Sequence, residues 1–468
     1  MSQVLVHLPP PQQKRAFLLM LAYAKQVERE GDAPLLVHCG VTGGSCSSNL
    51  FGNRLLCLAC QKSTQESVAE TQLPLVKLCE PNTPIDASSS STSGLTFTDR
   101  RGIVEGVYSC LVTILRVLTK DLKRVGATRR IIKHQFVTSA TILKAIYRLM
   151  DKRKIKRVAV LNGRYACRKS PIIAANSRQI PFDTLDFNLY GKPMIFRGHT
   201  PHDRAAIQHR MLSNPEDDVV ANDYFNARQD RTFNKFAAQH RQFTPPEGDR
   251  KMDRKVTFFL SSQDECESLG PEWRSVFRDN VDVIHQAATQ FPDTLFCVRF
   301  HPNQASILSD VEHGFDRLDI LRNVKIFGPT DDINSYLLID WSDIVVTFTS
   351  TISVEACWRG VPVIQLGPSF YDQLGISETP ASTEEFLGLL AGEIRPKSRE
   401  ATRRFAHYEV KDYDELNDLA CENGNMKPIG FRRRLSFAVR PAKQANEIAT
   451  NGLKQIIRWN LRKRRNAA

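Results

Sequence analysis

The sequence predicts an α/β fold whose sheets are parallel and buried on both faces. The first observation is a series of three short, mostly β-branched runs: one ends at RFHPN (299–303), and the others are Asp343–Phe348 and Pro362–Leu366. Buried strands of parallel sheets have this length and composition. The second observation is a helical pattern at Ile352–Trp358 between two of these runs, with Gly360 as its stop. A strand, a helix and a strand in this order are typical of an α/β unit.

The ends of these strands are polar, and parallel sheets bind ligands at the carboxyl ends of their strands. His301 follows the first run, and Ser350 and Thr351 follow the second. The two hydroxyl residues either cap the helix that begins at Ile352 or bind a phosphate together with its free N–H groups. His301 is either an ordinary strand-end histidine or a ligand contact. Three polar strand ends in one series favour a binding site.

The amino-terminal part predicts another α/β sheet. Val4–Leu8 and Pro34–His38 have the pattern of strands, with an amphipathic helix at Lys14–Glu30 between them. Two more helices are expected at Asp99–Lys123 and Ile131–Asp151.

Four cysteines follow the second of these strands and end in a CxxC pair: Cys39, Cys46, Cys57 and Cys60. Thiols are the ligands of structural zinc, so a structural zinc or another metal is one interpretation. The first two are spaced widely for a zinc knuckle, and free cysteine is also a common small buried residue. Both interpretations stay open.

A further predicted strand, Arg157–Leu161, ends in Asn162-Gly163-Arg164. This turn places a guanidinium at a ligand-binding edge, or it is an ordinary turn with a surface arginine. Ile180–Phe187 predicts the next strand and carries Asp183 and Asp186. His199, His202 and Asp203 lie at a loop-to-helix boundary, where Asp203 caps the helix or His199 contacts a phosphate or sugar.

Residues 243–249 (FTPPEGD) are rich in proline and polar residues, which is typical of a linker. We therefore predict an amino-terminal domain at 1–245 with a Cys-rich insertion at 39–60, a second domain at 250–400 and a helical extension at 401–468. Lys255–Leu260 begins the second sheet and is followed by Asp264 and Glu265. These carboxylates position a sugar, act as a base or cap a helix.

The chain is basic, with 64 Lys and Arg against 51 Asp and Glu and a net charge of +13. This charge suits an anionic partner. Nucleic acid is not expected, because no zinc-finger or RNP pattern and no interleaved aromatic residues are present. The basic cluster Arg458–Arg465 is either a solvated helix end or a contact to an anionic membrane or glycolipid.

No apolar segment is long enough to span a membrane, and Met1–Pro11 is too short and too polar for a signal peptide. With 11 cysteines and no export signal, the expected location is the reducing cytoplasm. A peripheral position at the inner face of the cell membrane follows if the basic carboxyl-terminal helix contacts lipid.

Three stretches of the second half resemble a known family: RFHPN (299–303), TSTISVEACWRGVPVI (349–364) and LGPSFYDQLG (366–375). They are similar to bacterial capsule and surface polysaccharide biosynthesis proteins, the group that includes the β-Kdo transferases of capsule assembly. Further matches lie upstream: VAVLNGR (158–164), RGHTPHD (197–203) and FFLSSQDE (258–265).

This resemblance implies the GT-B fold of glycosyltransferases, in which two Rossmann-like domains face each other across a cleft and the final helices cross back onto the first. It also implies transfer of a sugar from a nucleotide donor on the second domain to a polysaccharide or glycolipid acceptor. A CMP-activated acidic sugar such as Kdo is preferred over a UDP-sugar. The donor and phosphate contacts that it implies are Arg299, His301, Asn303, Ser350, Thr351, Glu355 and Tyr371.

The turn at Asn162, Gly163 and Arg164, with His199, His202 and Asp203, is expected on the acceptor side. Relatives often carry a His-Glu-Arg-Gly run near Pro181, which this sequence lacks. The general base therefore stays open.

Candidate catalytic groups are Asp183, Asp186, Asp203, Asp264, Glu265 and His301. No DxD motif ends a strand of the second domain, so the reaction is expected to need no metal or other cofactor.

Two other function classes stay open. A nucleotide-sugar epimerase would need acid and base carboxylates but no acceptor groove. A non-catalytic scaffold in polysaccharide assembly or export would explain the missing acidic run.

Overall fold

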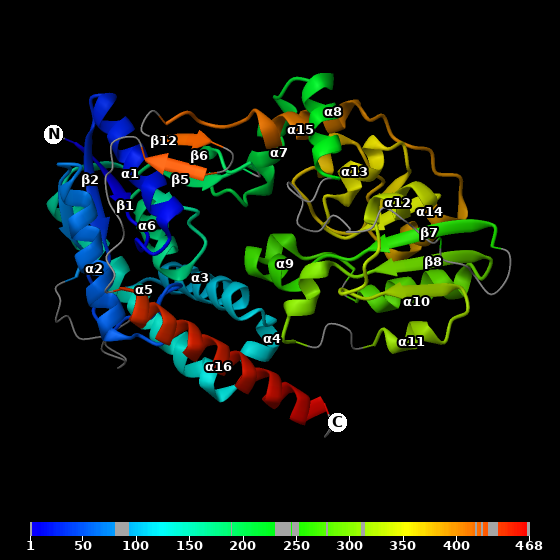
Figure 1. Cartoon of the computed structure of the whole chain (residues 1–468), viewed down its shortest axis with the longest axis horizontal. Coiled ribbons are helices and arrows are strands. Elements are labelled where there is room, and N and C mark those ends of the chain that lie inside the picture. Colours follow the sequence, from blue (N-terminus) through cyan, green and yellow to red (C-terminus); the bar gives the residue numbers. More distant parts are fainter. Residues whose placement is uncertain are drawn as a thin grey trace. The chain divides into compact units, whose positions relative to one another are not determined.

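The computed structural model describes residues 2–79, 93–188, 190–229, 245, 252–277, 279–309, 314–416, 419–422, 425–428 and 439–465. The chain forms two compact units (Figure 1). The first contains Met1–Asp203 and Tyr413–Ala468, and the second contains Arg204–Asp412. The predicted boundary at 245–250 lies mostly outside the described residues, and the chain enters the second unit earlier, after Asp203.

The first unit contains a six-stranded sheet in the order β3-β2-β1-β4-β5-β6. Its strands are β1 (Gln3–His7), β2 (Ala33–His38), β3 (Leu75–Lys77), β4 (Ile155–Leu161), β5 (Phe182–Phe187) and β6 (Pro193–Arg197). Neighbouring strands are parallel except for β5 and β6, which are antiparallel. The strand order reverses at β1, which makes its carboxyl end a preferred place for a ligand.

The helices of this part are α1 (Lys14–Arg29), α2 (Arg54–Ala69), α3 (Phe97–Leu115), α4 (Thr119–Leu122), α5 (Gly126–Lys152) and α6 (Ala166–Ser177). The side chain of Asn53 caps α2, and Thr96 and Asp99 form a capping box that begins α3. The single helix predicted over Asp99–Lys123 is interrupted, because Arg116 adopts a left-handed conformation (φ 57°) that ends α3.

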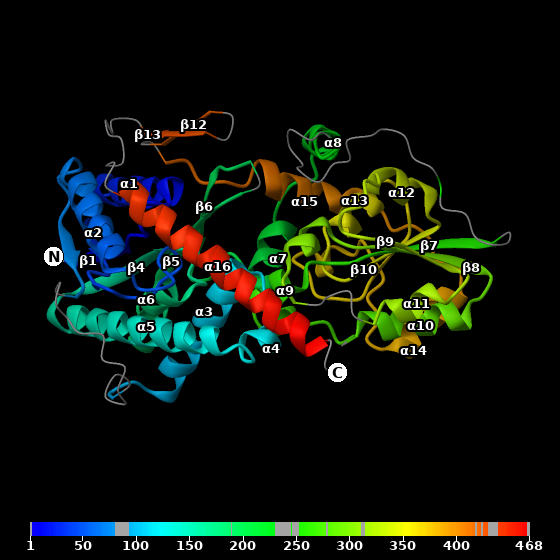
Figure 2. The same ribbon diagram turned by 60° about the horizontal axis from the view of Figure 1, so that its bottom comes forward.

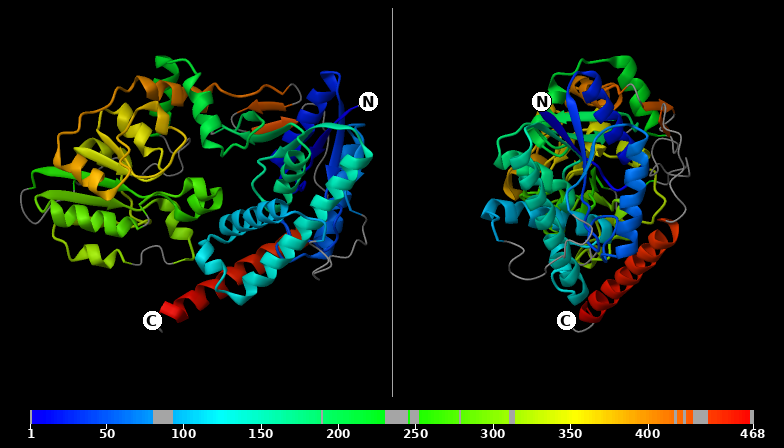
Figure 3. Two further views of the ribbon diagram at one scale, coloured as in Figure 1. Left: turned by 180° about the vertical axis from the view of Figure 1, so that it is seen from behind. Right: turned by 90° about the vertical axis from the view of Figure 1, so that its left-hand side faces the viewer.

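The carboxyl-terminal segment completes the first unit. After the antiparallel pair β12 (Leu419–Glu422) and β13 (Asn425–Pro428), helix α16 (Val439–Arg465) lies beside α2 (Figures 1 and 3). Leu453 and Ile457 of α16 are buried, and Asn446 donates a hydrogen bond to the Ser48 carbonyl (3.4 Å). Helix α16 thus packs on the first unit, but β12 and β13 interrupt the predicted helical extension at 401–468.

The second unit contains a five-stranded parallel sheet in the order β11-β10-β7-β8-β9. Its strands are β7 (Arg254–Phe259), β8 (Thr294–Arg299), β9 (Val324–Phe327), β10 (Ile344–Thr347) and β11 (Val363–Gln365). The chain builds β7, β8 and β9 outward in one direction and then returns to add β10 on the other side of β7. The strand order therefore reverses at β7.

Helices cover both faces of this sheet (Figure 2). On one face α10 (Asn280–Gln290), α11 (Asp316–Asp319) and α14 (Thr383–Ala391) share a core with the strands, and α12 (Ser335–Trp341) and α13 (Ile352–Trp358) cover the other. The remaining helical elements of this unit are α7 (Arg204–Leu212), α8 (Asp218–Ala227), α9 (Gln263–Leu269), η2 (Pro271–Trp273), η3 (Pro302–Ser306), η4 (Asp372–Leu374) and α15 (Glu400–Val410).

Helix α10 begins at Asn280, where the side chain of Asp279 caps it. Helix α8 packs on α15 within the second unit. The predicted α/β class with parallel sheets in two Rossmann-like units is confirmed. Among the described residues, no helix combines the length and the apolar composition that a membrane span requires.

Candidate functional site

A pocket of about 600 Å³, open to solvent, lies within the second unit at the carboxyl ends of β7, β8 and β10. It therefore occupies the point where the strand order reverses. Its lining comes from the strand ends, from the start of α12 and α13 and from the residue that follows α8. These residues are Arg228, Phe259, Leu260, Arg299, Phe300, His301, Pro302, Ser335, Tyr336, Ser350, Thr351, Ile352 and Glu355.

His301 lines this pocket, and the turn that follows holds its ring. Its Nδ1 accepts a hydrogen bond from the Asn303 N–H (3.1 Å), which caps η3, and the Gln304 side chain bonds back to the His301 N–H. In a neutral imidazole this leaves the ring proton on Nε2. The sequence Pro302-Asn303 thus fixes both the orientation and the tautomer of the histidine.

Ser350 and Thr351 line the same pocket, as the sequence predicted. Neither gives α13 a side-chain cap, and α13 has only seven residues. The Ser350 hydroxyl accepts from the Ile352 N–H (3.3 Å), which turns the chain between β10 and α13. The capping interpretation is therefore wrong for Thr351, whose side chain is exposed.

A buried ion pair forms one wall of the pocket. Glu355 is only 2% exposed, and its Oε1 accepts from Arg228 Nε (3.1 Å) and Nη2 (2.9 Å). Burial opposes the charge of Arg228, but the adjacent carboxylate outweighs this and raises the pKa of the guanidinium. Glu355 Oε2 has no hydrogen-bond partner among the described residues. The Tyr336 hydroxyl donates to the Arg228 carbonyl (2.9 Å).

Sequence reasoning missed Arg228 and Tyr336. Arg228 follows α8, far along the chain from the strand ends, and only its ion pair with the buried Glu355 shows that it belongs to the pocket. A single charged residue in a polar stretch carries no pattern that predicts such a pairing.

Arg299 and Tyr371 play different parts from those predicted. Arg299 lines the pocket, but its guanidinium donates to the backbone carbonyls of Gly328 and Asp331 (3.0 Å for the latter), and burial lowers its pKa. Tyr371 is buried behind the pocket, and its hydroxyl donates to the Ser350 carbonyl. It therefore holds the Ser350 turn in place instead of lining the pocket.

Asp264 and Glu265 lie in the first turn of α9, where carboxylates stabilise a helix. Asp264 accepts from the Ser262 hydroxyl (2.7 Å), and Glu265 accepts from the Asn303 amide (2.8 Å). Neither of these two carboxylates, nor Asn303, lines the pocket. These contacts favour the interpretation in which both acids stabilise the start of a helix.

A second group of predicted residues meets in the first unit, after β4 and β5. The Asn162 amide donates to Asp186 Oδ2 (2.5 Å) and lies 3.3 Å from His202 Nε2. Burial raises the pKa of Asp186, and burial together with Arg164 lowers the pKa of His202 to about 3. Gly163 has a positive φ (76°), and a Cβ there would lie 2.2 Å from Ile172, so the turn requires glycine.

The other acceptor-side residues are less closely joined. Asp183 is buried, accepts a hydrogen bond from the Tyr23 hydroxyl (2.6 Å) and forms an ion pair with Arg157 (3.6 Å). These contacts give Asp183 a structural role inside the first unit. The Arg164 guanidinium lies over the Tyr165 ring. His199 Nδ1 bonds the Thr200 carbonyl (3.0 Å), and Asp203 closes a turn onto the same carbonyl through its N–H (3.1 Å).

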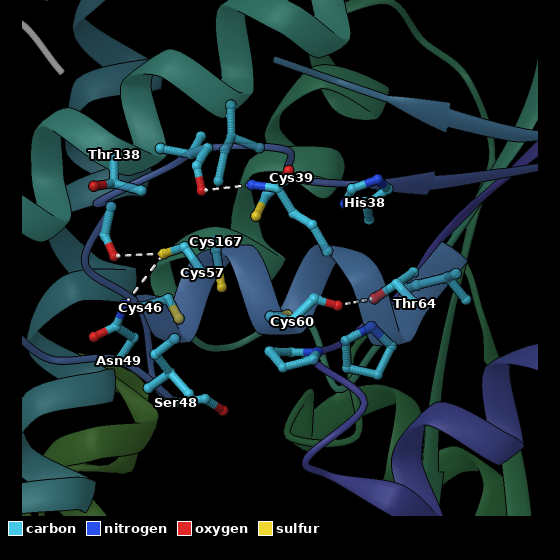
Figure 4. A pocket seen from close by; sticks show the side chains of 18 of the residues that line it. His38, Cys39, Cys46, Ser48, Asn49, Cys57, Cys60, Thr64, Thr138 and Cys167 are labelled. Atoms are coloured by element: carbon cyan, nitrogen blue, oxygen red, sulfur yellow. Dashed lines mark hydrogen bonds between the residues drawn. The ribbon is translucent and has the colours of Figure 1, made fainter. Parts of the chain in front are cut away.

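The four predicted cysteines do meet, in a pocket of about 700 Å³ at the carboxyl ends of β1 and β2 (Figure 4). Cys167 of α6 joins them. Burial is the main cause that raises the pKa of the Cys60 thiol, to about 12. However, in the part of the chain that the structure describes, no three His, Cys, Asp or Glu side chains are placed to hold one metal ion. The geometry gives no support to the predicted zinc site.

Comparison with known proteins connects the second unit to one family. Residues 234–388 match the family model described as capsule polysaccharide biosynthesis protein. The fold is thus an α/β fold of two Rossmann-like units, the organisation expected of GT-B proteins. The segment that lines most of the pocket matches this family model, in agreement with the resemblance found in the sequence.

The similar solved structures are distant. They include two structures of KpsC from Thermosulfurimonas dismutans: a β-Kdo 2,4 transferase (15% identity, 54% of this chain and 79% of that chain, TM-score 0.35) and a β-Kdo 2,7 transferase (14%, 66% and 89%, TM-score 0.37). A UDP-GlcNAc 2-epimerase from Neisseria meningitidis is 11% identical over 95% of this chain and 99% of that chain, with a TM-score of 0.29. No curated protein matches.

Proposed function

We propose that the protein is a glycosyltransferase of capsule or surface polysaccharide synthesis that binds a nucleotide sugar in the pocket of the second unit. The observation that supports this most is the convergence of His301, Ser350, Thr351 and Glu355 in one pocket within the family-matched segment. These side chains offer hydrogen-bond donors and acceptors suited to a phosphate and to sugar or ribose hydroxyls.

Each residue has a distinct task in this proposal. His301 Nε2–H and the two hydroxyls stabilise the nucleotide phosphate as the bond to the sugar breaks, because negative charge develops on that leaving group. Glu355 Oε2 accepts from a donor hydroxyl, while Arg228 holds the carboxylate in place. The Tyr336 ring lies in the lining and gives an apolar surface for the base or sugar.

The acceptor hydroxyl must lose a proton, and we assign this task to Asp186. Asp183 is occupied by Tyr23 and Arg157, whereas Asp186 is held at a strand end by Asn162. Its raised pKa brings it closer to the range in which a carboxylate works as a general base. A CMP-activated acidic sugar remains the preferred donor, by the resemblance alone, and the proposed reaction uses no metal.

Helix α16 supports a peripheral place at an anionic membrane, where a glycolipid acceptor would lie. Besides its buried residues, α16 carries apolar side chains that remain exposed: Ile448 (72%), Ile456 (50%) and Trp459 (61%). Exposed cations stand beside them: Arg458, Arg462 and Lys463. A helix with this composition binds at the interface of anionic lipids.

The function is tested by incubating the protein with CMP- and UDP-sugars, with and without capsule-type glycan or glycolipid acceptors, and measuring nucleotide and sugar products by mass spectrometry. Acceptor-dependent release of nucleotide supports transfer. Isomerisation without an acceptor indicates an epimerase, and the absence of nucleotide binding indicates a scaffold. Either of these last two results would overturn the proposal.

A further inference from the structure

The first unit has another pocket, of about 670 Å³ and open to solvent, beside the start of α5. Its lining consists of Tyr108 from α3, Lys123 after α4, and Arg129, Ile132, Lys133 and Phe136 from α5. The four residues of α5 follow the spacing i, i+3, i+4 and i+7, so they form one face of that helix. The lining thus contains three cations, two aromatic rings and an aliphatic side chain, but no carboxylate.

The three cations of this pocket have no carboxylate partners. Among the described residues, neither Lys123 nor Arg129 nor Lys133 forms an ion pair. The neighbouring Arg124 does form one, with Asp121 (3.4 Å). Asp121 is also the only acid between residues 116 and 133, where seven Lys and Arg stand. The positive charge of the pocket is therefore not neutralised by the chain itself.

The start of α5 adds to this charge. Val125 precedes the helix without a side-chain cap, and the first turn contains no acidic residue. The free N–H groups of a helix start carry a partial positive charge. In addition, Arg129 and Lys133 are spaced i, i+4, where like charges destabilise a helix. This arrangement lowers the stability of the free protein, and a bound anion would offset the loss.

The turn between α4 and α5 holds the cations in place. The hydroxyl of Thr128, which is fully buried, donates to the Val125 carbonyl (2.7 Å). Arg129 Nε donates to the Lys123 carbonyl (3.0 Å), and the Lys123 ammonium lies 5.3 Å from the centre of the Tyr108 ring. Because these contacts tie Lys123 to both α3 and α5, little side-chain freedom has to be lost when a ligand binds.

Helix α16 passes close to this pocket. Figures 1 and 2 both show its carboxyl-terminal half near α4. Burial and the nearby charge of Arg116, at the end of α3, lower the pKa of Lys454 in α16. The exposed Trp459 follows in the same half of α16. An apolar anchor and a cationic pocket thus lie near each other in one unit.

We propose that this pocket binds the terminal phosphate of an anionic lipid headgroup. Such a phosphate carries about 1.5 to 2 negative charges at neutral pH, and Lys and Arg are its usual partners. The half-buried Tyr108, Ile132 and Phe136 offer an apolar surface to the part of the lipid below the phosphate. The site is separate from the nucleotide pocket, which lies in the other unit, and does not depend on sugar transfer.

The test is co-sedimentation of the full chain with phosphatidylcholine vesicles that contain either phosphatidic acid or phosphatidylglycerol at equal surface charge. Phosphatidic acid presents a terminal phosphate, whereas glycerol covers the phosphate of phosphatidylglycerol. We expect binding to the phosphatidic acid vesicles to be tighter by at least about fivefold, the effect of one cation at an anionic surface. Equal binding at equal surface charge would overturn the proposal.

Variants locate the site. Lys133→Gln should weaken binding to the phosphatidic acid vesicles by about fivefold and reduce the preference for them. Arg130→Gln is the matched control, because it removes the same charge from an exposed position of α5 that does not line the pocket, and it should keep the preference. An equal loss of preference in both variants would contradict the site.

Two further measurements separate this site from the fold and from α16. Lys133→Gln should melt no lower than the unaltered chain, since it removes a like-charge contact; a lower melting temperature would show that the lysine serves the fold. Trp459→Ser should weaken binding to both kinds of vesicle and keep the preference for phosphatidic acid. Loss of that preference in Trp459→Ser would assign it to α16 and overturn the proposal.

Other anions are outcomes of the same series. Calorimetry with inorganic phosphate alone tests a soluble ligand: binding as tight as that of the vesicles, and lost in Lys133→Gln, would overturn the lipid as its source. Tighter binding of a short single-stranded RNA than of the vesicles would overturn it as well. Weak or absent binding of both, together with the preference for phosphatidic acid, is the result that we expect.

Discussion

The proposed role of His301 makes a sharp prediction, because its two ring nitrogens have separate tasks. Nδ1 accepts from the Asn303 N–H and caps η3, while Nε2 is the nitrogen to which the proposal assigns the donor for a ligand. An asparagine at this position can still accept from the Asn303 N–H but has no donor at the place of Nε2. A glutamine can place an amide donor there but does not cap η3.

His301→Asn should therefore weaken nucleotide binding and leave stability nearly unchanged. A hydrogen bond to a charged phosphate contributes about 1.5–3 kcal/mol, which corresponds to a loss of affinity of about 10- to 150-fold. His301→Gln should bind better than His301→Asn but melt lower, since a lost cap costs about 1 kcal/mol. Titration calorimetry with CMP and UDP measures the affinity, and thermal melts measure the stability.

The opposite ranking, with the asparagine variant binding as well as the unaltered protein, would refute the assignment of the Nε2 donor. Equal weakening by both variants together with equal loss of stability would show that only the cap matters.

Four further outcomes are expected. Arg228→Met leaves the Glu355 carboxylate buried without its partner and should lower the free energy of unfolding of the second unit by about 3–5 kcal/mol. The loss should be smaller when Glu355→Leu is added, because no charge then stays buried alone. Urea unfolding curves in which the double variant recovers no stability would disprove the coupling. Burial raises the pKa of Glu409 to about 7, so the folded state holds a proton that the unfolded state loses near 4.5, and stability should fall as pH rises between these values. Thermal melts across this pH range should show a smaller change of melting temperature with pH for Glu409→Gln. Trp459→Ser should reduce co-sedimentation with phosphatidylglycerol vesicles but not the small binding to phosphatidylcholine vesicles, and unchanged binding would exclude α16 as the contact. Sugar transfer should proceed equally with EDTA and with Mg²⁺, whereas a strict need for Mg²⁺ would contradict the metal-independent reaction.

The sequence predicted the strand-end residues well because the relevant pattern is local. An apolar run followed by His301, or by Ser350 and Thr351, defines both the strand and the edge at which it ends, and one sheet brings such edges together. The four cysteines could also be grouped, since they lie in one short segment after β2.

Contacts between distant segments could not be predicted in this way. Arg228 pairs with Glu355 and Cys167 joins the cysteine pocket only through the packing of helices, and nothing near either residue indicates its partner. Tyr371 was placed in the donor site because of its motif, but the motif does not tell whether a side chain lines a pocket or supports it from behind. The second unit begins at Arg204, where the sequence does not have the composition of a linker. The proline-rich segment 243–249 therefore predicts a domain boundary in the wrong place.

The first unit is assembled from both ends of the chain, while the second is continuous. During synthesis, residues 204–412 can therefore collapse into their own sheet as soon as they leave the ribosome. The first unit takes longer to complete, because α16, which packs on α2, follows the second unit in the sequence. A ribosome-stalled or prematurely terminated product would carry a finished second unit next to an incomplete first one, and proteases should remove the latter first.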